Sequence, residues 1–248
     1  MGSSPSLLFR QALVELPRGA PLSTRLLQDH GLSPKQVAQL SASGWLRRLG
    51  RGVYLLPGDE LNRDAALAWL TSELPGLHIA GKTALGWRGV RHNLPFGERL
   101  VMWGDRSATL PAWFTQAYPA SYQATHLFDD ALPSGIAMAP LPGGRLDLLV
   151  STPERALLEL LSDVGKGQSM EEARHLVEGA RSLRMDVLET LLAHLKRIKV
   201  VRLAHALAEE LDLPWVVLAR RHSERLGGGR RWVSATKTGD RLNLKRPS

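Results

Sequence analysis

The chain has 248 residues, of which 44% are hydrophobic and 23% charged, so it is globular and long enough for one large domain or roughly two to three small ones. Its 32 lysines and arginines exceed its 24 aspartates and glutamates, and the net charge of +8 favours a polyanionic partner over an acidic small molecule. The absence of cysteine excludes disulfides and thiolate metal sites, and the 8 histidines lack ligand spacing, so we expect no metal and no cofactor.

Charge is distributed unevenly along the chain. Residues 1–58 carry 7 basic and 2 acidic side chains, residues 59–219 carry 16 and 20, and residues 220–248 carry 9 and 2. Two basic ends therefore flank a mildly acidic body, which indicates two regions that face a polyanion or another partner. For the C-terminal stretch, a solvated basic tail is an equally good interpretation.

The N-terminal apolar run, Leu7 to Val14, lacks the properties of a targeting or membrane segment. It is interrupted by Arg10 and Gln11, and no cleavage signature follows it. The chain also lacks any stretch of about 18 apolar residues, the length that a membrane span needs. We therefore expect a cytoplasmic protein with no membrane partner.

Residues 1–44 predict three short helices with their own start and stop signals. Ser23 and Ser33 are residue types that cap helix N-termini, and Pro34 occupies a first helical position, where a missing N–H costs nothing. Gly31 and Gly44 stand where a helix C-terminus favours a left-handed residue. The second and third helices, separated by a glycine-containing turn, form a helix-turn-helix pattern. The predicted helices cover residues 6–16, 24–30 and 34–43.

A hairpin is predicted directly after the third helix. Residues 45–49 and 53–56 have the pattern of two strands, joined by the tight turn of residues 50–52. A helix-turn-helix followed by such a hairpin is typical of a winged helix that binds double-stranded DNA. The alternative is an ordinary solvated hairpin beside a helical hairpin.

The third helix and the hairpin carry side chains suited to DNA. Val37 and Leu40 are predicted to face the core, which leaves the polar residues near the start of the helix on its open face. Glutamine and lysine there can meet base edges and phosphates, and arginines on a hairpin can reach phosphates or a narrow minor groove. Either glutamine can face adenine, phosphate or water, so the bases that are read stay open. The predicted DNA contacts are Lys35, Gln36, Gln39, Arg47, Arg48 and Arg51.

The segment from Gly76 to Thr83 matches the P-loop pattern, in which backbone amides cradle phosphates while a lysine and a threonine meet the γ-phosphate and magnesium. Taken alone, the match predicts an NTPase. A P-loop needs a buried strand before its first glycine, but residues 62–74 are predicted as an amphipathic helix that ends at Pro75. We therefore expect a packed helix from Ile79 to Trp87, with nucleotide binding as the alternative.

The middle of the chain predicts a mixed α/β region. Strands are expected over residues 99–103, 135–139 and 145–150, and a helix capped by Thr152 over residues 153–163. Glu154 lies in the first turn of that helix, where a carboxylate complements the helix dipole, so we interpret it as structural. A nuclease would pair Asp147 with Glu154, but the Glu-x-Lys expected on a following strand is absent.

Helices dominate from Ser169 onward, with leucine stripes that we interpret as core. Three helices are predicted over residues 170–178, 185–194 and 200–211. Residues 220–246 are rich in arginine and glycine, and we expect them to be too flexible and charged to form much core. This segment is a candidate for gripping a partner protein, although the same arginines would also serve to extend a DNA footprint. The candidate partner contacts are Arg220, Arg221, Arg225, Arg230 and Arg231.

Four of these segments resemble parts of one protein family. Gly44 to Tyr54, after the Leu-Ser-Pro-Lys-Gln helix start, resembles the N-terminal winged-helix domain of the AbiEi antitoxins and related transcriptional regulators. His78 to Gly89 is similar to the helix that follows that domain, and Ser151 to Leu161 to the family's Ser-x-Pro-Glu-Arg-Ala helix start. Arg221 to Pro247 looks like the closing β-hairpin region. The resemblance implies an antitoxin of a type IV toxin–antitoxin pair, which represses its own operon and counters a nucleotidyltransferase-like toxin.

Together these observations predict an α+β protein. Residues 1–60 would form a winged helix-turn-helix, and residues 61–248 a mixed α/β domain with a helical segment, a sub-boundary near residue 165 and a basic C-terminal hairpin. We expect a non-enzymatic antitoxin whose partners are operator DNA and a toxin. Two alternatives stay open: a regulator whose α/β domain senses a ligand in an apolar pocket, and an NTPase or nuclease.

Overall fold

The computed structural model describes residues 13–90, 99–133, 135–225, 232–235 and 241–244. The chain divides into two compact units. The first comprises Met1–Glu73 and Thr109–Pro119, and the second comprises Leu74–Ala108 and Ala120–Ser248. Helices occur together with sheets of both parallel and antiparallel pairing, so the fold is α+β, as predicted. The DNA-binding module ending near residue 60 and the sub-boundary near residue 165 stay predictions.

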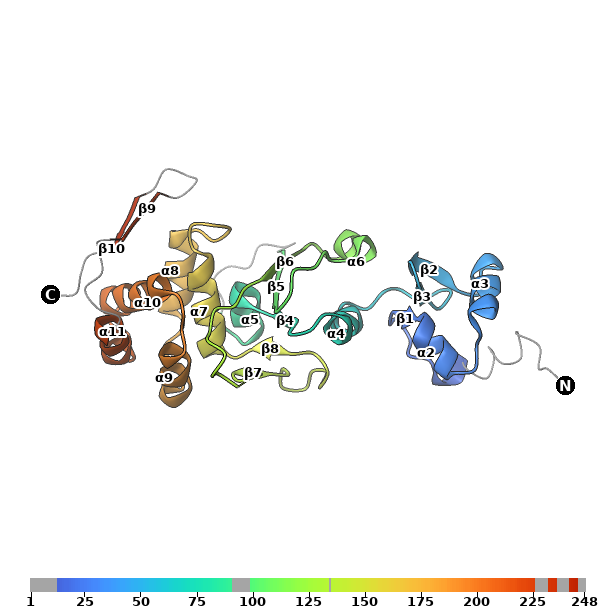
Figure 1. Cartoon of the computed structure of the whole chain (residues 1–248), viewed down its shortest axis with the longest axis horizontal. Coiled ribbons are helices and arrows are strands. Elements are labelled where there is room, and N and C mark those ends of the chain that lie inside the picture. Colours follow the sequence, from blue (N-terminus) through green and yellow to red (C-terminus); the bar gives the residue numbers. More distant parts are fainter. Residues whose placement is uncertain (1–12, 91–98, 134, 226–231, 236–240, 245–248) are drawn as a thin grey trace. The chain divides into compact units, whose positions relative to one another are not determined.

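The first unit combines short helices with a three-stranded sheet. Strand β3 lies in the middle of this sheet and pairs antiparallel with β1 and β2 (Figure 1). The predicted second and third helices and the hairpin are confirmed to within two residues at each end, whereas β1 was not predicted. The predicted helix over residues 6–16 lies largely outside the described residues. The described elements are β1 (Leu22–Ser23), α2 (Thr24–Asp29), α3 (Pro34–Ala42), β2 (Arg47–Gly50), β3 (Val53–Leu55), α4 (Arg63–Glu73) and α6 (Ala112–Ala117).

Local capping determines where α2 and α3 begin and end. Ser23 Oγ accepts a hydrogen bond from a backbone N–H in the first turn of α2 at 3.1 Å, and Ser33 caps α3 in the same way. Gly31 and Gly44 follow the two helices with φ of +83° and +81°, a region that favours glycine. The predicted caps and stop signals are therefore confirmed.

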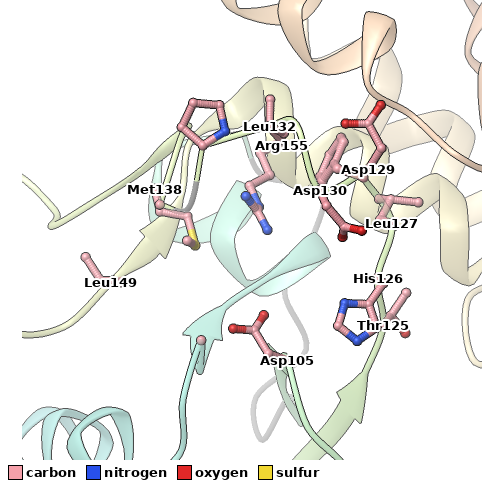
Figure 2. Close-up of a pocket in the computed structure, with 14 residues that line it drawn as sticks. Asp105, Thr125, His126, Leu127, Asp129, Asp130, Leu132, Met138, Leu149 and Arg155 are labelled. Carbon is pink, nitrogen blue, oxygen red and sulfur yellow. The ribbon is translucent and has the colours of Figure 1, made fainter.

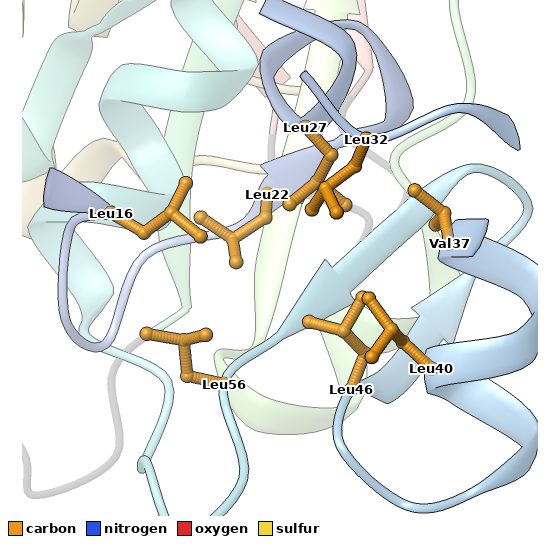
Figure 3. Close-up of a cluster of buried hydrophobic side chains, with 8 residues drawn as sticks. All are labelled: Leu16, Leu22, Leu27, Leu32, Val37, Leu40, Leu46 and Leu56. Atoms are coloured by element: carbon orange, nitrogen blue, oxygen red, sulfur yellow. The ribbon is translucent and has the colours of Figure 1, made fainter. Parts of the chain in front are cut away.

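A leucine-rich core holds α2 and α3 against the sheet. Val37 and Leu40 of α3 are 1% and 5% exposed, as their helical spacing predicted. Full burial of a side chain of this size contributes about 1.5–3 kcal/mol, so the cluster fixes which face of α3 is open to solvent. The cluster comprises Leu16, Leu22, Leu27, Leu32, Val37, Leu40, Leu46 and Leu56 (Figure 3).

Helix α6, which the sequence did not predict, joins the first unit through aromatic contacts. Trp113 meets Trp69 of α4 edge to face, with ring centroids 5.5 Å apart. It also lies against Gly50 at the end of β2, where an added Cβ would come within 3.0 Å of the indole ring. Tyr118, the residue after α6, donates its hydroxyl proton to the carbonyl of Leu61. These contacts support the hairpin strand β2 from within the first unit.

The second unit contains a five-stranded mixed sheet with the order β6-β5-β4-β8-β7 (Figure 1). β5 and β6 are parallel, as are β4 and β8, whereas β4–β5 and β7–β8 are antiparallel. The strand predicted over residues 99–103 is confirmed, while those over 135–139 and 145–150 are reduced to short pairs near their ends. The strands are β4 (His78–Ile79), β5 (Leu100–Gly104), β6 (Ala120–Ala124), β7 (Met138–Ala139) and β8 (Val150–Ser151).

Helix α7 lies between the sheet region and a group of C-terminal helices. It packs against α5 on one side and against α8, α9 and α10 on the other. The predicted bounds of α7 and α8 are confirmed at both ends, and those of α9 and α10 to within two residues. No helix in the described ranges is long and apolar enough to cross a membrane. The helices are α5 (Gly81–Trp87), α7 (Pro153–Asp163), α8 (Met170–Glu178), α9 (Met185–Ala193), α10 (Ile198–Glu210) and α11 (Val216–Arg225).

The arginine-rich C-terminal segment is more structured at its start than we expected. Its first residues belong to α11, which buries Ala219, His222 and Ser223 and packs on α9 and α10. The expectation that residues 220–246 form little core is therefore wrong for residues 220–225. Further along, β9 (Trp232–Ala235) and β10 (Arg241–Leu244) pair antiparallel, consistent with the predicted hairpin. Arg230 and Arg231 lie outside the described residues.

Candidate nucleic-acid interface

Helix α3 presents two polar side chains that nothing else in the described chain binds. Lys35 and Gln39 are exposed, because the buried positions Val37 and Leu40 turn them away from the core. Neither side chain has a hydrogen bond or ion pair among the described residues. Their donor and acceptor groups are therefore available to an external partner.

Gln36, between them, has a different role. Its side-chain Oε1 accepts a hydrogen bond from the Ser33 N–H at 2.8 Å, while its own N–H donates to Ser33 Oγ at 3.4 Å. This reciprocal pair is a capping box, which satisfies two backbone donors that the first turn of a helix leaves unpaired. The Ser-x-x-Gln spacing was visible in the sequence, so the signal for this role was present and was missed.

The hairpin places three arginines on exposed positions. Arg47 Nη2 donates to the Asp59 carbonyl at 3.1 Å, and Arg48 Nε donates to the Gly50 carbonyl at 3.3 Å. Arg51, at the tip, is exposed and has no partner among the described residues. The first two guanidinium groups are therefore partly held by the backbone, and the third is unrestrained.

The tip of the hairpin is tied to the start of α2. The carbonyl of Gly52, whose φ is +72°, accepts hydrogen bonds from Thr24 N–H at 2.9 Å and from Thr24 Oγ1 at 3.2 Å. Asp59, close after the hairpin, pairs with Arg18 and accepts from the Gly19 N–H at 2.7 Å. Its carboxylate is thus neutralised inside the unit and does not oppose an anion.

The P-loop-like segment is occupied by internal hydrogen bonds. The Gly81 N–H donates to Glu159 Oε2 at 3.0 Å, and Lys82 Nζ donates to Glu172 Oε1 at 3.0 Å. Thr83 Oγ1 accepts from the Val101 N–H at 2.9 Å. Strand β4 lies between the two glycines of the pattern and not before the first. The Gly81 amide, the Lys82 ammonium and the Thr83 hydroxyl, which would hold phosphate and magnesium in a P-loop, are therefore engaged within the fold. The helix predicted from Ile79 begins at Gly81.

Glu159 is the centre of a buried polar cluster that the sequence did not predict. Its side chain is 0% exposed and accepts from His78 Nε2 at 3.0 Å, Arg155 Nε at 2.8 Å and Ser151 Oγ at 2.9 Å, besides Gly81. Burial by itself raises the pKa of Glu159, but His78 and Arg155, with the hydrogen bonds, bring it below its ordinary value. The carboxylate is ionised and fully bonded, so we interpret the cluster as structural.

The two carboxylates considered for a nuclease have separate partners. Asp147 is exposed and pairs with Arg145 at 2.7 Å. Glu154 is 1% exposed, and it accepts from Arg184 N–H at 2.9 Å, Arg184 Nη2 at 3.0 Å and Thr152 Oγ1 at 2.7 Å. Burial raises the pKa of Glu154, but these hydrogen bonds hold it at about 2. Thr152 therefore supports Glu154 and makes no side-chain cap of its own on α7.

The arginines of α11 are paired within the second unit. Arg220 Nη2 lies 3.0 Å from Glu209 Oε1, Arg221 pairs with Glu189, and Arg225 Nη2 donates to the Ala193 carbonyl at 3.2 Å. These groups are exposed, so the pairs are weak and do not prevent contact with a partner. Among the described residues, no group of three or more histidines, aspartates and glutamates is arranged to hold a metal ion.

Comparisons with known proteins cover nearly the whole chain. Residues 7–96 match the family model described as transcriptional regulator, AbiEi antitoxin N-terminal domain, and residues 97–244 match the one described as transcriptional regulator, AbiEi antitoxin, Type IV TA system. No curated protein matches the chain. The crystal structure of the RV2827C protein from Mycobacterium tuberculosis is similar in fold, with a TM-score of 0.58 and 16% sequence identity over 86% of this chain and 78% of that chain. As the resemblance predicted, the chain belongs to the AbiEi antitoxin family of transcriptional regulators from type IV toxin–antitoxin systems.

Proposed function

We propose that this chain is a DNA-binding antitoxin that represses its own operon and counters a nucleotidyltransferase-like toxin, without catalysing a reaction itself. The observation that carries the DNA-binding half is a pair of exposed cations without a partner among the described residues, Lys35 on α3 and Arg51 at the hairpin tip. Asp59, the carboxylate close after the hairpin, is neutralised by Arg18 and the Gly19 N–H. Exposed cations without internal partners lose the least when they meet phosphate.

In this proposal the first unit acts as a winged helix-turn-helix. The N-terminal half of α3 enters the major groove, where Lys35 contacts phosphate and Gln39 faces base edges. Arg51 reaches phosphate or the minor groove beside the hairpin, and Arg47 and Arg48 add phosphate contacts from its first strand. The Thr24 bonds to the hairpin tip hold the wing in place before DNA binds, which lowers the entropic cost of association.

The capping box gives the two glutamines of α3 different roles. A glutamine reads adenine with both ends of its amide, because Oε1 accepts from N6 while Nε2 donates to N7. The Oε1 of Gln36 is engaged by the Ser33 N–H, so its amide has only the Nε2 end to offer. Within the part of the chain that the structure describes, the Gln39 side chain has no partner, so both ends of its amide are available. We therefore assign base reading to Gln39, and helix start plus at most a phosphate contact to Gln36.

We assign the toxin contact to the second unit and its arginine-rich C-terminal segment. The exposed arginines Arg220, Arg221 and Arg225 lie together on α11, and each keeps donors beyond those used in its internal pair. Arg230 and Arg231 follow in the same stretch of sequence. This assignment rests on the family and on charge, and it names a basic surface for an acidic face of the toxin.

The experiment that tests the proposal is an electrophoretic mobility shift with the full chain and the DNA immediately upstream of its own gene. We expect a specific complex that weakens as salt is raised, because bound cations displace counterions. Equal binding to an unrelated duplex of the same length would contradict operator recognition. Co-expression with the product of a neighbouring nucleotidyltransferase-like gene should restore growth, and failure to do so would remove the antitoxin half while leaving the DNA-binding half.

A further inference from the structure

The second unit contains a cavity of about 640 Å³ whose lining is charged (Figure 2). This volume lies within the range of about 300–1,000 Å³ that small-molecule sites occupy. It is not the apolar pocket that a simple ligand sensor would have, because carboxylates and a guanidinium face it together with a few apolar side chains. The lining comes from the ends of β4 and β5, the segment after β6, the β7–β8 region and α7.

Arg155, from α7, supplies the positive side of the cavity. Its Nε donates to Glu159 at 2.8 Å, its Nη1 donates to the Ile136 carbonyl at 3.1 Å, and its guanidinium lies over the Phe128 ring at 5.1 Å. These contacts hold the planar group in one orientation. No described residue accepts a hydrogen bond from Nη2, which leaves one donor edge for a ligand.

The buried cluster beneath Arg155 fixes the position of the guanidinium group. Glu159 is shared between Arg155 and His78, and the other ring nitrogen of His78 lies 2.7 Å from the Gly76 carbonyl. Both ring nitrogens of His78 therefore face oxygen atoms, and the ring helps to hold Glu159 in place beneath Arg155. Among the described residues the cluster engages only Nε of Arg155, so the Nη2 edge stays available for a charge-assisted hydrogen bond to a ligand carboxylate.

Asp105 supplies the negative side. It lies at the end of β5, and Figure 2 shows its carboxylate and the Arg155 guanidinium pointing toward the same space. No described residue donates a hydrogen bond to this carboxylate. It lies so close to Gly76 that a Cβ there would be 2.2 Å from its Oδ2, so glycine at position 76 permits this placement. Asp130, another lining residue, has a fully exposed side chain that lies 3.7 Å from Lys196 Nζ, a weak pair that leaves the carboxylate accessible.

We propose that this cavity binds a zwitterionic small molecule of the α-amino acid class with an apolar side chain. The ligand carboxylate binds Arg155 Nη2, and its ammonium group binds Asp105, with Asp130 adding to the attraction. The apolar side chain lies against Leu132, Met138 and Leu149, which line the same cavity. This site is separate from the proposed DNA contacts and does not depend on them.

The test is calorimetric titration of the purified full chain with L-leucine as the probe. We expect saturable binding, little binding of L-leucine methyl ester, which lacks the carboxylate, and little of N-acetyl-L-leucine, which lacks the ammonium. The variant Asp105→Asn should weaken L-leucine binding by about tenfold or more through loss of the charged partner. The matched control is Asp147→Asn, which removes an exposed carboxylate of the same unit that does not line the cavity and should bind as the parent does.

Any of three results would overturn the proposal. The first is the absence of saturable binding of L-leucine up to about 10 mM, a concentration beyond ordinary weak-ligand affinities. The second is binding of the methyl ester as tightly as L-leucine, because the cavity would then recognise a cation and Arg155 would have no role. A Met138→Trp variant, which fills the cavity without changing charge, should also abolish binding in a chain whose thermal unfolding is unchanged. Retained binding in that variant would place the probe elsewhere.

Discussion

Helices α3 and α7 begin with the same local signal and use their polar residues in opposite ways. In each, a hydroxyl residue is followed by proline and then by polar residues: Ser33-Pro34 in α3 and Thr152-Pro153 in α7. The carboxylates Glu154 and Glu159 of α7 are buried and bonded on every side. In contrast, Lys35 and Gln39 of α3 are exposed and have no partner among the described residues.

The contrast teaches that a capping signal predicts where a helix begins but not what the polar side chains of that helix do. Burial with complete hydrogen bonding makes a charge part of the fold, since an unpaired charge there would cost several kcal/mol. Exposure without an internal partner leaves a charge for another molecule. We therefore predict different effects for similar substitutions in the two units. Substitution of the buried carboxylates of α7 should lower the free energy of unfolding, and substitution of the exposed residues of α3 should weaken DNA binding.

The largest effect should come from Glu159→Ala. The substitution leaves His78, Arg155 and the Gly81 N–H without their shared acceptor in a buried site, and we expect the free energy of unfolding to fall by about 3–5 kcal/mol. Urea denaturation of the full chain measures this. The control Glu171→Ala removes an exposed carboxylate on α8 and should change stability by less than about 0.5 kcal/mol. Equal effects of the two variants would refute the structural role of the cluster.

The next effect is a loss of stability in acid that depends on Glu154. Its pKa is about 2 in the folded chain and 4.5 in the reference state, so the unfolded chain takes up the proton first as the pH falls. The contribution is complete well above pH 4.5 and is lost between there and about pH 2. Full conversion of the pKa difference gives roughly 3 kcal/mol, and because solvent screens the half-exposed Arg184 partner we expect about 2 kcal/mol. Urea denaturation at several pH values, compared with Glu154→Gln, isolates it from other carboxyls. Parallel curves for the two proteins would contradict the assignment.

Local sequence signals were enough to predict most of the helices and the exposed residues of the candidate site. Ser23, Ser33 and Ser169 mark the starts of three helices, because a cap acts within one turn of its own position. Exposure of Lys35 and Arg51 followed from periodicity and from the turn at the hairpin tip. Each of these signals acts on residues within a few positions of itself, so no information about tertiary contacts is needed to interpret it.

The sequence could not predict features that depend on distant partners. Residues 120–124 pair in parallel with β5, a contact that leaves no local alternation, and so β6 was missed. The P-loop-like pattern gave no sign that the Gly81 N–H donates to Glu159, which lies 78 residues later. The arginines of α11 suggested a solvated tail. The sequence does not reveal that Ala219 and His222 are buried on α9 and α10, because tertiary packing determines that burial.

A smaller effect, on specificity, should separate the two glutamines of α3. Gln39→Ala should cost about 1–2 kcal/mol, close to tenfold, at one adenine position of the operator and little at the others. Gln36→Glu keeps a capping acceptor for the Ser33 N–H and should retain the base preference. Binding assays over operators with single base changes measure this for both variants. If Gln36→Glu relaxes the preference and Gln39→Ala does not, the division of roles is reversed, while DNA binding itself stands.

Loss of one phosphate contact should have a smaller effect on operator binding. Lys35→Ala and Arg51→Ala should each lower the slope of log affinity against log salt by about one, with the same loss at every sequence. Their unfolding free energies should match the parent, because neither side chain has an internal partner among the described residues. Unchanged affinity and slope in both variants would remove α3 and the hairpin from the DNA interface.

The smallest effect belongs to Arg220→Ala, which removes the same charge from the second unit. Its pair with Glu209 is exposed on both sides, so the unfolding free energy should change by less than about 1 kcal/mol. Operator affinity and salt slope should stay at the parent values, while rescue of growth from the toxin should weaken if α11 contacts that partner. A drop in salt slope equal to that of Arg51→Ala would instead place α11 on the DNA, and the separation of the two units into a DNA-binding part and a toxin-binding part would no longer hold.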